Sequence, residues 1–231
     1  AIAVYQQLIQ RFARHPDIEV QQHVAHAYYN TGCELGQQQD LNGAIASYNT
    51  LLKRFGYQPA MQEVCALGLC NRAAAYYHLG QRAEEQADYL ALIRLLENHP
   101  LPQQDLLHID TLLNYADTLD LQGDSAGEMA VYEAAWRRFA DHPHTDVQAK
   151  VAHVLYFHSD LLIRTGKTAA DPNIQASHWR RAQHLLRQAL DKPPFQENCT
   201  LLSWLAYVCV LLGEDGAARP LLSKALATAD N

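Results

Sequence analysis

The chain has 231 residues, 48% of them hydrophobic and 19% charged, which is the balance of a soluble globular protein with a sizeable core. Its formal net charge of −7 argues against nucleic-acid binding, because such proteins present clustered lysines and arginines to phosphates. No apolar run approaches the roughly 20 residues that span a bilayer, and residues 1–13 lack the features of a secretory signal. We therefore expect no nucleic-acid partner and no membrane partner.

Five cysteines, an odd number without a Cys-x-x-Cys pair, favour a reducing compartment over a disulfide framework. The cytoplasm is accordingly the expected location. The chain opens on Ala1 without an initiator methionine, which we interpret as the start of a fragment from a larger protein.

A tyrosine and a proline recur in fixed phase, with the proline always eleven residues after the tyrosine. The four copies are Tyr5 with Pro16, Tyr48 with Pro59, Tyr89 with Pro100, and Tyr132 with Pro143. Successive copies lie 43, 41 and 43 residues apart. A unit of this size cannot bury its own apolar face and must stack on its neighbours, so the period predicts a solenoid.

Residues 1–16 have the pattern of a single helix, the second helix of a truncated repeat. This arrangement leaves Ile2, Tyr5 and Ile9 without the partner that a first helix would supply. Pairs of helices then follow, since apolar residues recur there at three- and four-residue spacing. The predicted pairs are residues 19–59, 61–100, 103–143, 145–194 and 195–229. Gly80 and Gly123 are expected to cap the ends of first helices.

Two later segments depart from the simple pattern. In the pair at 145–194, the turn is expected to be lengthened by residues 167–175, which include Pro172. In the pair at 195–229, Pro220 falls inside the second helix, where we expect a kink or a late start. The whole chain, residues 1–231, is thus predicted to be one all-α solenoid of helical hairpins with about 11 helices.

A small residue recurs at the same place in each first helix, where it would let the two helices of a hairpin approach closely. These positions are Gly32, Ala73, Ala116, Ser159 and Ala206. The periodic tyrosines are expected to fill the space between adjacent pairs. This pattern indicates packing rather than catalysis.

The segment from Ala27 to Leu52 contains AYYNTGCEL and then DLNGAIASYNTLL, and with these residues the chain resembles the tetratricopeptide repeat (TPR) family. The resemblance covers nearly the whole chain, as a long-period variant of about 43 residues against the family's usual 34 or so. A HEAT-like or other helical-pair solenoid remains the alternative. The resemblance implies a right-handed superhelix whose first helices line a concave groove.

Three asparagines, Asn30, Asn71 and Asn114, recur two residues before the small position of their first helices. Asparagine is intrinsically unfavourable inside a helix, so its recurrence needs a reason. One interpretation is that the amides hold the backbone of a peptide in the groove, as the resemblance implies. The other is that each amide bonds a neighbouring repeat and orders the stack. The equivalent residues of the last two repeats are Phe157 and Trp204.

Stepping one turn along the first helices adds further residues to the candidate groove. They are Tyr29, Tyr77, Asp110, Asp117, Asp120, Tyr156 and Asp160. The aspartates favour a basic or amphipathic partner, although they could equally serve only to solubilise the surface. The acidic tails that some family members bind are not expected as ligands, because no Lys or Arg lies beside Asn30 or Asn114, and Arg72 is expected to point elsewhere.

The 12 histidines lack the spacing of a zinc-protease helix, and the chain has no phosphate loop and no nucleophile elbow. We therefore expect no catalytic residue, no metal site and no cofactor. The predicted function is that of a non-catalytic interaction scaffold that binds a peptide or protein segment in its concave groove. The alternative is a structural, sensor or oligomerisation arm of a larger protein. Such an arm would act through its ends and convex face and could self-associate through the exposed first helix.

Overall fold

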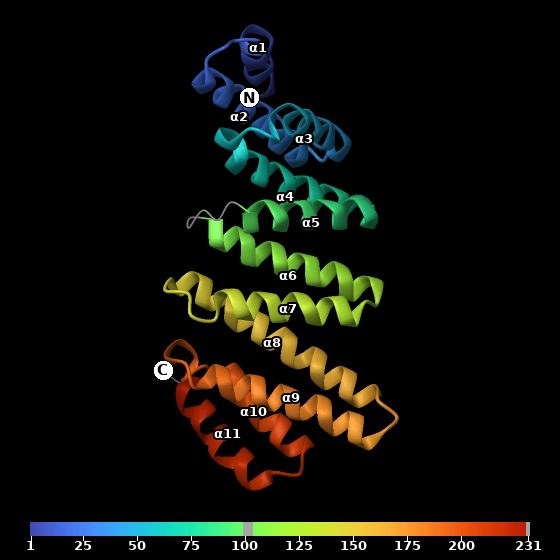
Figure 1. Ribbon diagram of the computed structural model, residues 1–231, viewed down its shortest axis with the longest axis vertical. Helices are drawn as coiled ribbons and strands as arrows, with labels where there is room; N and C mark the ends of the chain where they lie inside the picture. Colours follow the sequence, from blue (N-terminus) through green and yellow to red (C-terminus); the bar gives the residue numbers. More distant parts are fainter. Residues whose placement is uncertain (99–103, 230–231) are drawn as a thin grey trace. The chain divides into compact units, whose positions relative to one another are not determined.

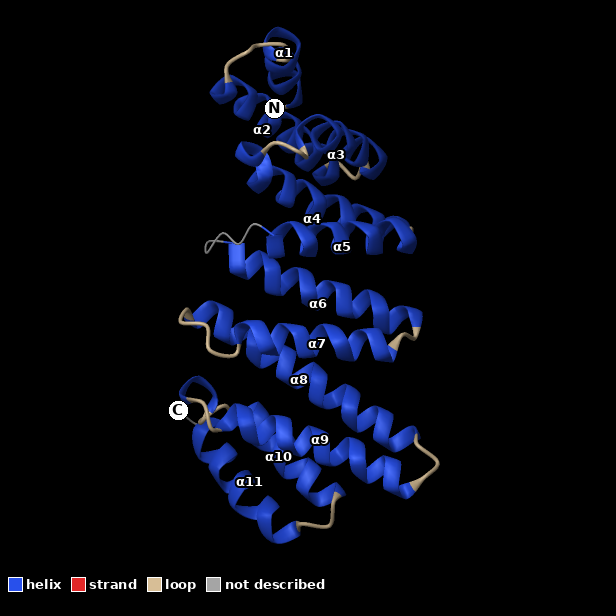
Figure 2. Cartoon of the chain, in the orientation of Figure 1, coloured by secondary structure: helices blue, strands red, loops and turns tan. Residues whose placement is uncertain are grey.

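The computed structural model describes residues 1–98 and 104–229. Pro100, one of the periodic prolines, lies outside the described residues. The chain forms two compact units, Ala1–Gln104 and Asp105–Asn231, which we describe separately. Within the described ranges every regular element is helical (Figure 2).

The helices follow one another in simple succession along the chain (Figure 1). Unit 1 contains α1 (Ile2–Phe12), α2 (Ile18–Gln37), α3 (Leu41–Phe55), the 3-10 helix η1 (Pro59–Met61), α4 (Gln62–Leu79) and α5 (Arg82–Asn98). Unit 2 contains α6 (Asp105–Gln122), α7 (Ser125–Phe139), α8 (Thr145–Thr168), α9 (Pro172–Leu190), the 3-10 helix η3 (Pro193–Phe195), α10 (Cys199–Leu211) and α11 (Asp215–Ala229).

Consecutive helices pack as hairpins: α2 with α3, α4 with α5, α6 with α7, α8 with α9, and α10 with α11. The described part of the chain therefore contains eleven α-helices in sequential hairpins, which confirms the predicted fold class. Whether the two units continue one solenoid over residues 1–231 remains a prediction. None of the described helices is both long and apolar enough to cross a bilayer.

Local signals in the sequence explain where the helices begin and end. Gly80 and Gly123 adopt φ angles of 72° and 75°, a left-handed conformation that glycine reaches without strain, and this confirms them as caps. At the start of α3, the Asp40 carboxylate accepts a hydrogen bond of 2.9 Å from the backbone N–H of Gly43. A Cβ at residue 43 would lie 2.3 Å from Asp40 Oδ2, so a larger residue there would require the Asp40 carboxylate to shift.

The predicted small positions all lie inside the hairpins. Gly32 is buried, and Ala73, Ala116, Ser159 and Ala206 have no exposed surface. The reason is clearest at Gly32, where an added Cβ would lie 2.4 Å from Cε1 of Tyr48. Tyr48 therefore sits against the first helix of its own hairpin, and its 3% exposure shows that the ring is part of the core.

The first helix is better covered than the sequence suggests. Leu8, Ile9 and Phe12 of α1 pack against a buried cluster that includes Val24 and Leu51. Ile9 therefore packs against the α2–α3 hairpin, and the absence of a first helix from its own repeat stays a prediction. Val4, one turn before Leu8 on α1, remains 64% exposed.

The turn between α8 and α9 is not lengthened as predicted. It comprises only residues 169–171, because α8 runs to Thr168 and α9 already starts at Pro172. Proline suits the first helical position, where its missing N–H would have no partner. Asp171 completes this start by accepting a hydrogen bond of 2.8 Å from the N–H of Asn173. Of the two alternatives for Pro220, the late start is wrong, since α11 begins at Asp215 and contains Pro220. The kink stays a prediction.

Within unit 2, the first helices of successive hairpins lie close together. α8 packs directly against both α6 and α10, whereas the backbones of the second helices α7 and α9 stay apart. The exposed faces of α6, α8 and α10 therefore form a continuous surface, and α7 and α9 leave a gap over α8.

Candidate functional site

The predicted groove residues divide between the two units. Tyr29, Asn30, Asn71 and Tyr77 lie on α2 and α4 of unit 1, and Asp110, Asn114, Asp117, Asp120, Tyr156 and Asp160 lie on α6 and α8 of unit 2. Each group is considered within its own unit.

In unit 1, Asn71 links two first helices. Its Nδ2 donates hydrogen bonds to the Tyr29 hydroxyl at 3.2 Å and to Cys33 Sγ at 3.4 Å, both on α2. Burial and the neighbouring Cys33 raise the pKa of Tyr29 to about 12, so its hydroxyl stays protonated at neutral pH. The amide of Asn71 is therefore engaged in packing α4 against α2.

The other two asparagines differ from Asn71. Within residues 1–98 and 104–229, the side-chain amides of Asn30 and Asn114 make no hydrogen bond to another group of the chain. Asn30 is half-buried, whereas Asn114 is exposed on α6. The stacking interpretation therefore fits Asn71, whereas the side-chain amides of Asn30 and Asn114 are not engaged within the described ranges.

Tyr77 and Arg72 have partners within unit 1. Tyr77 is 44% exposed, and the Arg82 guanidinium lies over its ring at 4.3 Å from the centroid. Arg72 binds the Asp88 carboxylate of α5 through Nε at 2.8 Å and Nη2 at 2.5 Å. This bidentate pair directs Arg72 into the hairpin and away from Asn71, as expected.

In unit 2, cations of α8 neutralise part of the predicted acidic surface. Lys150 Nζ lies 2.7 Å from Asp110 Oδ1. Arg164 lies between two of the other aspartates, with Nε at 2.7 Å from Asp160 and Nη1 at 3.4 Å from Asp120. Asp117 has no such ion pair in the described part of the chain. Its partial burial and the neighbouring Asp120 raise its pKa.

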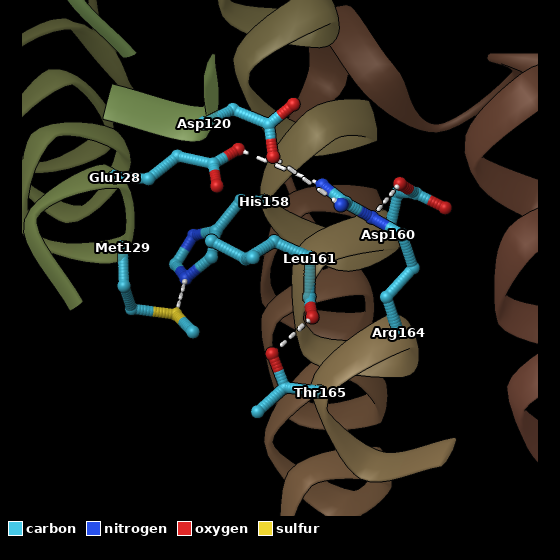
Figure 3. A network of polar contacts seen from close by, with 8 residues as sticks. All are labelled: Asp120, Glu128, Met129, His158, Asp160, Leu161, Arg164 and Thr165. Carbon is cyan, nitrogen blue, oxygen red and sulfur yellow. Dashed lines mark hydrogen bonds and ion pairs between the residues drawn. The ribbon is translucent and has the colours of Figure 1, made fainter. Parts of the chain in front are cut away.

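A buried glutamate joins this network (Figure 3), and it lies 43 residues after Glu85, which is buried at the same phase of its own repeat. Glu128, near the start of α7, is 2% exposed, and its Oε1 lies 3.7 Å from Arg164 Nη2. Its Oε2 has no hydrogen-bond partner among the described residues. Burial, and next the Asp120 carboxylate, raise the pKa of Glu128. Carboxylates from three helices therefore surround one arginine, so the negative charge is only partly compensated.

Aromatic rings continue the same surface from α8 onto α10. The ring centroids of Tyr156 and Trp204 lie 5.3 Å apart at an interplanar angle of 81°, and those of Trp204 and Tyr207 lie 6.0 Å apart. Lys167 Nζ lies 5.2 Å from the Tyr207 centroid. Phe157, 40% exposed, is in the same repeat phase as Asn114 and Trp204. The sequence shows that aromatic residues replace asparagine at this phase, but it indicates only that the asparagine series ends there.

These faces make up what we call the first-helix surface of unit 2. Its members are Asp110, Asn114, Asp117, Asp120, Tyr156, Phe157, Asp160, Arg164, Trp204 and Tyr207. Ion pairs connect α6 with α8, and ring contacts connect α8 with α10. Among the described residues, no three His, Cys, Asp or Glu side chains come together in a way that could hold a metal ion.

No family model matches the chain, and no curated protein matches it either. Solved structures do share its fold. The crystal structure of the MamA protein matches with a TM-score of 0.59 at 11% identity, over 89% of this chain and 92% of the other. YrrB, described as a TPR protein with an unusual peptide-binding site, matches with a TM-score of 0.57 at 12% identity, over 100% of this chain and 95% of the other.

BtubC from P. vanneervenii matches with a TM-score of 0.56 at 16% identity, over 99% of this chain and 89% of the other. At such low identity these likenesses show the fold alone. The chain is therefore similar to TPR proteins in the arrangement of its helices, and it is a TPR-like helical-repeat protein.

Proposed function

We propose that the chain is a non-catalytic interaction scaffold that binds a peptide or protein segment on its first helices. The observation that carries this proposal is the first-helix surface of unit 2, where an acidic stretch on α6 and α8 adjoins an aromatic stretch on α8 and α10. YrrB, which has a similar fold, is described as having a peptide-binding site, and this supports the same class of function.

The chemistry of this surface favours a segment that carries both basic and apolar side chains. Asp117, Asp120 and Asp160 outnumber the single cation Arg164 that lies among them. A lysine or arginine of a partner would add the missing positive charge and steer the approach. Trp204 and Tyr207 offer ring faces and edges to apolar or cationic side chains, and the free amide of Asn114 can hydrogen-bond a peptide backbone.

The experiment is a selection of a random peptide library, with peptides of about 15 residues or four helical turns, against the 231-residue chain. We expect the recovered peptides to combine Lys or Arg with aromatic or aliphatic residues. Asp117→Lys should weaken the strongest of them by about tenfold, because it reverses a charge on the surface. Tyr207→Ala should weaken it by a similar factor through the lost ring contact.

The matched control is Glu197→Lys, which makes the same charge change at an exposed residue between η3 and α10. It should leave the affinity within about twofold. Peptides that bind Asp117→Lys and Tyr207→Ala as well as they bind the unchanged chain would refute the proposed surface.

A second candidate function is that of an assembly arm that contacts further copies of the chain. Val4 on α1 is 64% exposed and Leu226 on α11 is 70% exposed, so both helices present apolar side chains to solvent. If these helices mediate self-association, light scattering should show a mass that rises with concentration, and Leu226→Glu or Val4→Glu should abolish the rise. A constant monomer mass across the concentration range would exclude this function.

A further inference from the structure

A second recessed surface of unit 2 lies between the second helices α7 and α9. Because their backbones stay apart over α8, a hollow of about 660 Å³ opens there, with walls from α7 and α9. Its floor includes Leu162 of α8 and Leu185 of α9, which are 1% and 7% exposed. We call it the α7–α9 groove. Its walls come from α7 and α9, which the first-helix surface does not use, whereas its floor shares α8 with that surface.

The walls of the α7–α9 groove carry an excess of positive charge. Arg137 of α7 and Arg180 and Arg181 of α9 line it, and the single carboxylate in the lining is Glu133, which lies 3.1 Å from Arg181. This concentration of cations is unusual in a chain of formal net charge −7. A guanidinium matches a carboxylate through two parallel N–H donors, so these walls suit acidic side chains.

The floor is apolar apart from one buried histidine. His158 is 4% exposed; its Nε2 lies 3.2 Å from Met129 Sδ, and its Nδ1 has no hydrogen-bond partner among the described residues. Burial, and next the charge of Arg181, lower the pKa of His158 to about 4, so the ring is neutral at pH 7. With the indole of Trp136 and the two leucines, the floor offers apolar contact area beneath a cationic rim.

The groove continues along both helices beyond this hollow. A second hollow of about 430 Å³ shares Trp136, Arg137 and Gln188 with the first and ends at Lys192. The carboxylates of Asp141 and Asp191 also line this second hollow, so the excess of positive charge belongs to the first. Lys192 is ion-paired with Asp141 and lies 5.8 Å from the Trp136 ring centroid. From residue 177 to its end at residue 190, α9 accounts for roughly 20 Å of groove at 1.5 Å per residue. A small anion would occupy only a fraction of that length.

We propose that the α7–α9 groove binds an acidic, amphipathic peptide segment about four helical turns long. Its apolar side chains lie on Trp136, Leu162 and Leu185, and its carboxylates bind Arg137 and Arg180. This site takes the opposite charge from the partner of the first-helix surface. Unit 2 therefore recognises two segments of complementary chemistry through different side chains, with α8 contributing to both surfaces.

The test uses a random peptide library selected against the unchanged chain, after depletion on the double variant Arg137→Glu/Arg180→Glu. Depletion removes peptides that bind elsewhere, so the remaining peptides should be rich in Asp, Glu and bulky apolar residues. The strongest peptide is then synthesised and titrated, with the indole N–H signals of the three tryptophans followed by NMR. Trp136 should shift, whereas Trp204 on the first-helix surface should not. Trp136→Phe assigns the signal.

Affinity should fall at least about tenfold in Arg137→Glu/Arg180→Glu and measurably in Arg180→Gln. The matched control is Arg138→Glu, a neighbour of Arg137 on α7 that does not line the groove, and its affinity should stay within about twofold. Both substituted arginines are exposed, and an unchanged Trp204 signal verifies that the variants fold.

Four outcomes of the peptide selection and titration would overturn the proposal, and a competition experiment adds a fifth. These are failure to recover any peptide, recovery of peptides without acidic enrichment, equal affinity for the double variant, and a shift of Trp204 instead of Trp136. Displacement of the peptide by inorganic phosphate at an equal concentration would instead identify the groove as a site for small anions, which also overturns it.

Discussion

Replacement of Gly32 by alanine would probe how closely α2 and α3 approach each other. A Cβ at residue 32 would lie 2.4 Å from Tyr48 Cε1 and 2.6 Å from Cζ, far inside van der Waals contact. The ring is 3% exposed and cannot move into solvent, so α2 and α3 must separate. Overpacking of this kind costs about 1 to 3 kcal/mol, against a gain of up to about 1 kcal/mol from the better helix propensity of alanine.

Gly36→Ala provides the matched control, because residue 36 lies on the same helix and an added Cβ there meets nothing within 4 Å. This variant changes only the propensity and should be neutral or slightly stabilising. The free energies of unfolding of the two variants should therefore differ by about 1 to 3 kcal/mol. With a urea m-value of about 2 kcal/mol/M, that is a difference of roughly 0.5 to 1.5 M between their midpoints.

The assay is urea denaturation followed by far-UV circular dichroism, with tryptophan fluorescence as an internal reference. All three tryptophans lie in unit 2, so the fluorescence reports on the unit that is not altered. Placing Gly32→Ala in a Tyr48→Ala background should remove its penalty, as expected of a direct contact. Equal midpoints for Gly32→Ala and Gly36→Ala would show that the close approach to Tyr48 does not limit this position.

Two further predictions separate residues that look alike in the sequence. Asn71→Ala should lower the free energy of unfolding by about 1 kcal/mol, because it removes two hydrogen bonds. Asn114→Ala should change the free energy of unfolding by no more than about 0.5 kcal/mol. Equal losses for the two variants in urea denaturation would contradict this distinction. His158 stays neutral in the folded state down to a pKa of about 4, while its ordinary pKa is near 6.5. As the pH falls, the unfolded chain therefore binds a proton at His158 before the folded chain does. The free energy of unfolding is highest above about pH 6.5 and decreases below it, by about 3 kcal/mol at pH 4. His158→Gln should remove this part of the pH dependence, and His153→Gln, at an exposed residue, should retain it. Denaturation followed by tryptophan fluorescence at several pH values measures both. An unchanged pH dependence in His158→Gln would refute the assignment of this effect to His158.

Much of the helical framework was predictable because it depends on local chemistry. The three- and four-residue apolar spacing, the capping glycines and the small positions act within one helix or one hairpin. The wrong prediction of a long turn at residues 167–175 arose because a second local signal competed with the loop-like composition. Asp171 and Pro172 start α9 at once, so the turn stayed short where composition alone suggested a long loop.

The candidate surfaces were predictable only in part. The phase of the repeat correctly placed the asparagines, aspartates and aromatic residues on first helices. It could not identify which cations reach them, because Lys150 and Arg164 come from the neighbouring hairpin, 40 or more residues away along the chain. The α7–α9 groove likewise brings together residues that share no motif.

The sequence by itself determined that this protein is a succession of helical hairpins, since a period near 43 residues leaves each unit with an apolar face that only a neighbour can bury. Tertiary structure alone decided how identical residues are used. The Asn71 amide meets Tyr29 across two helices while Asn114 stays free, and the gap between α7 and α9 places arginines around an apolar floor. The physical reason is that hydrogen bonds and ion pairs depend on distances of a few ångströms between helices, which the order of residues along one helix does not specify.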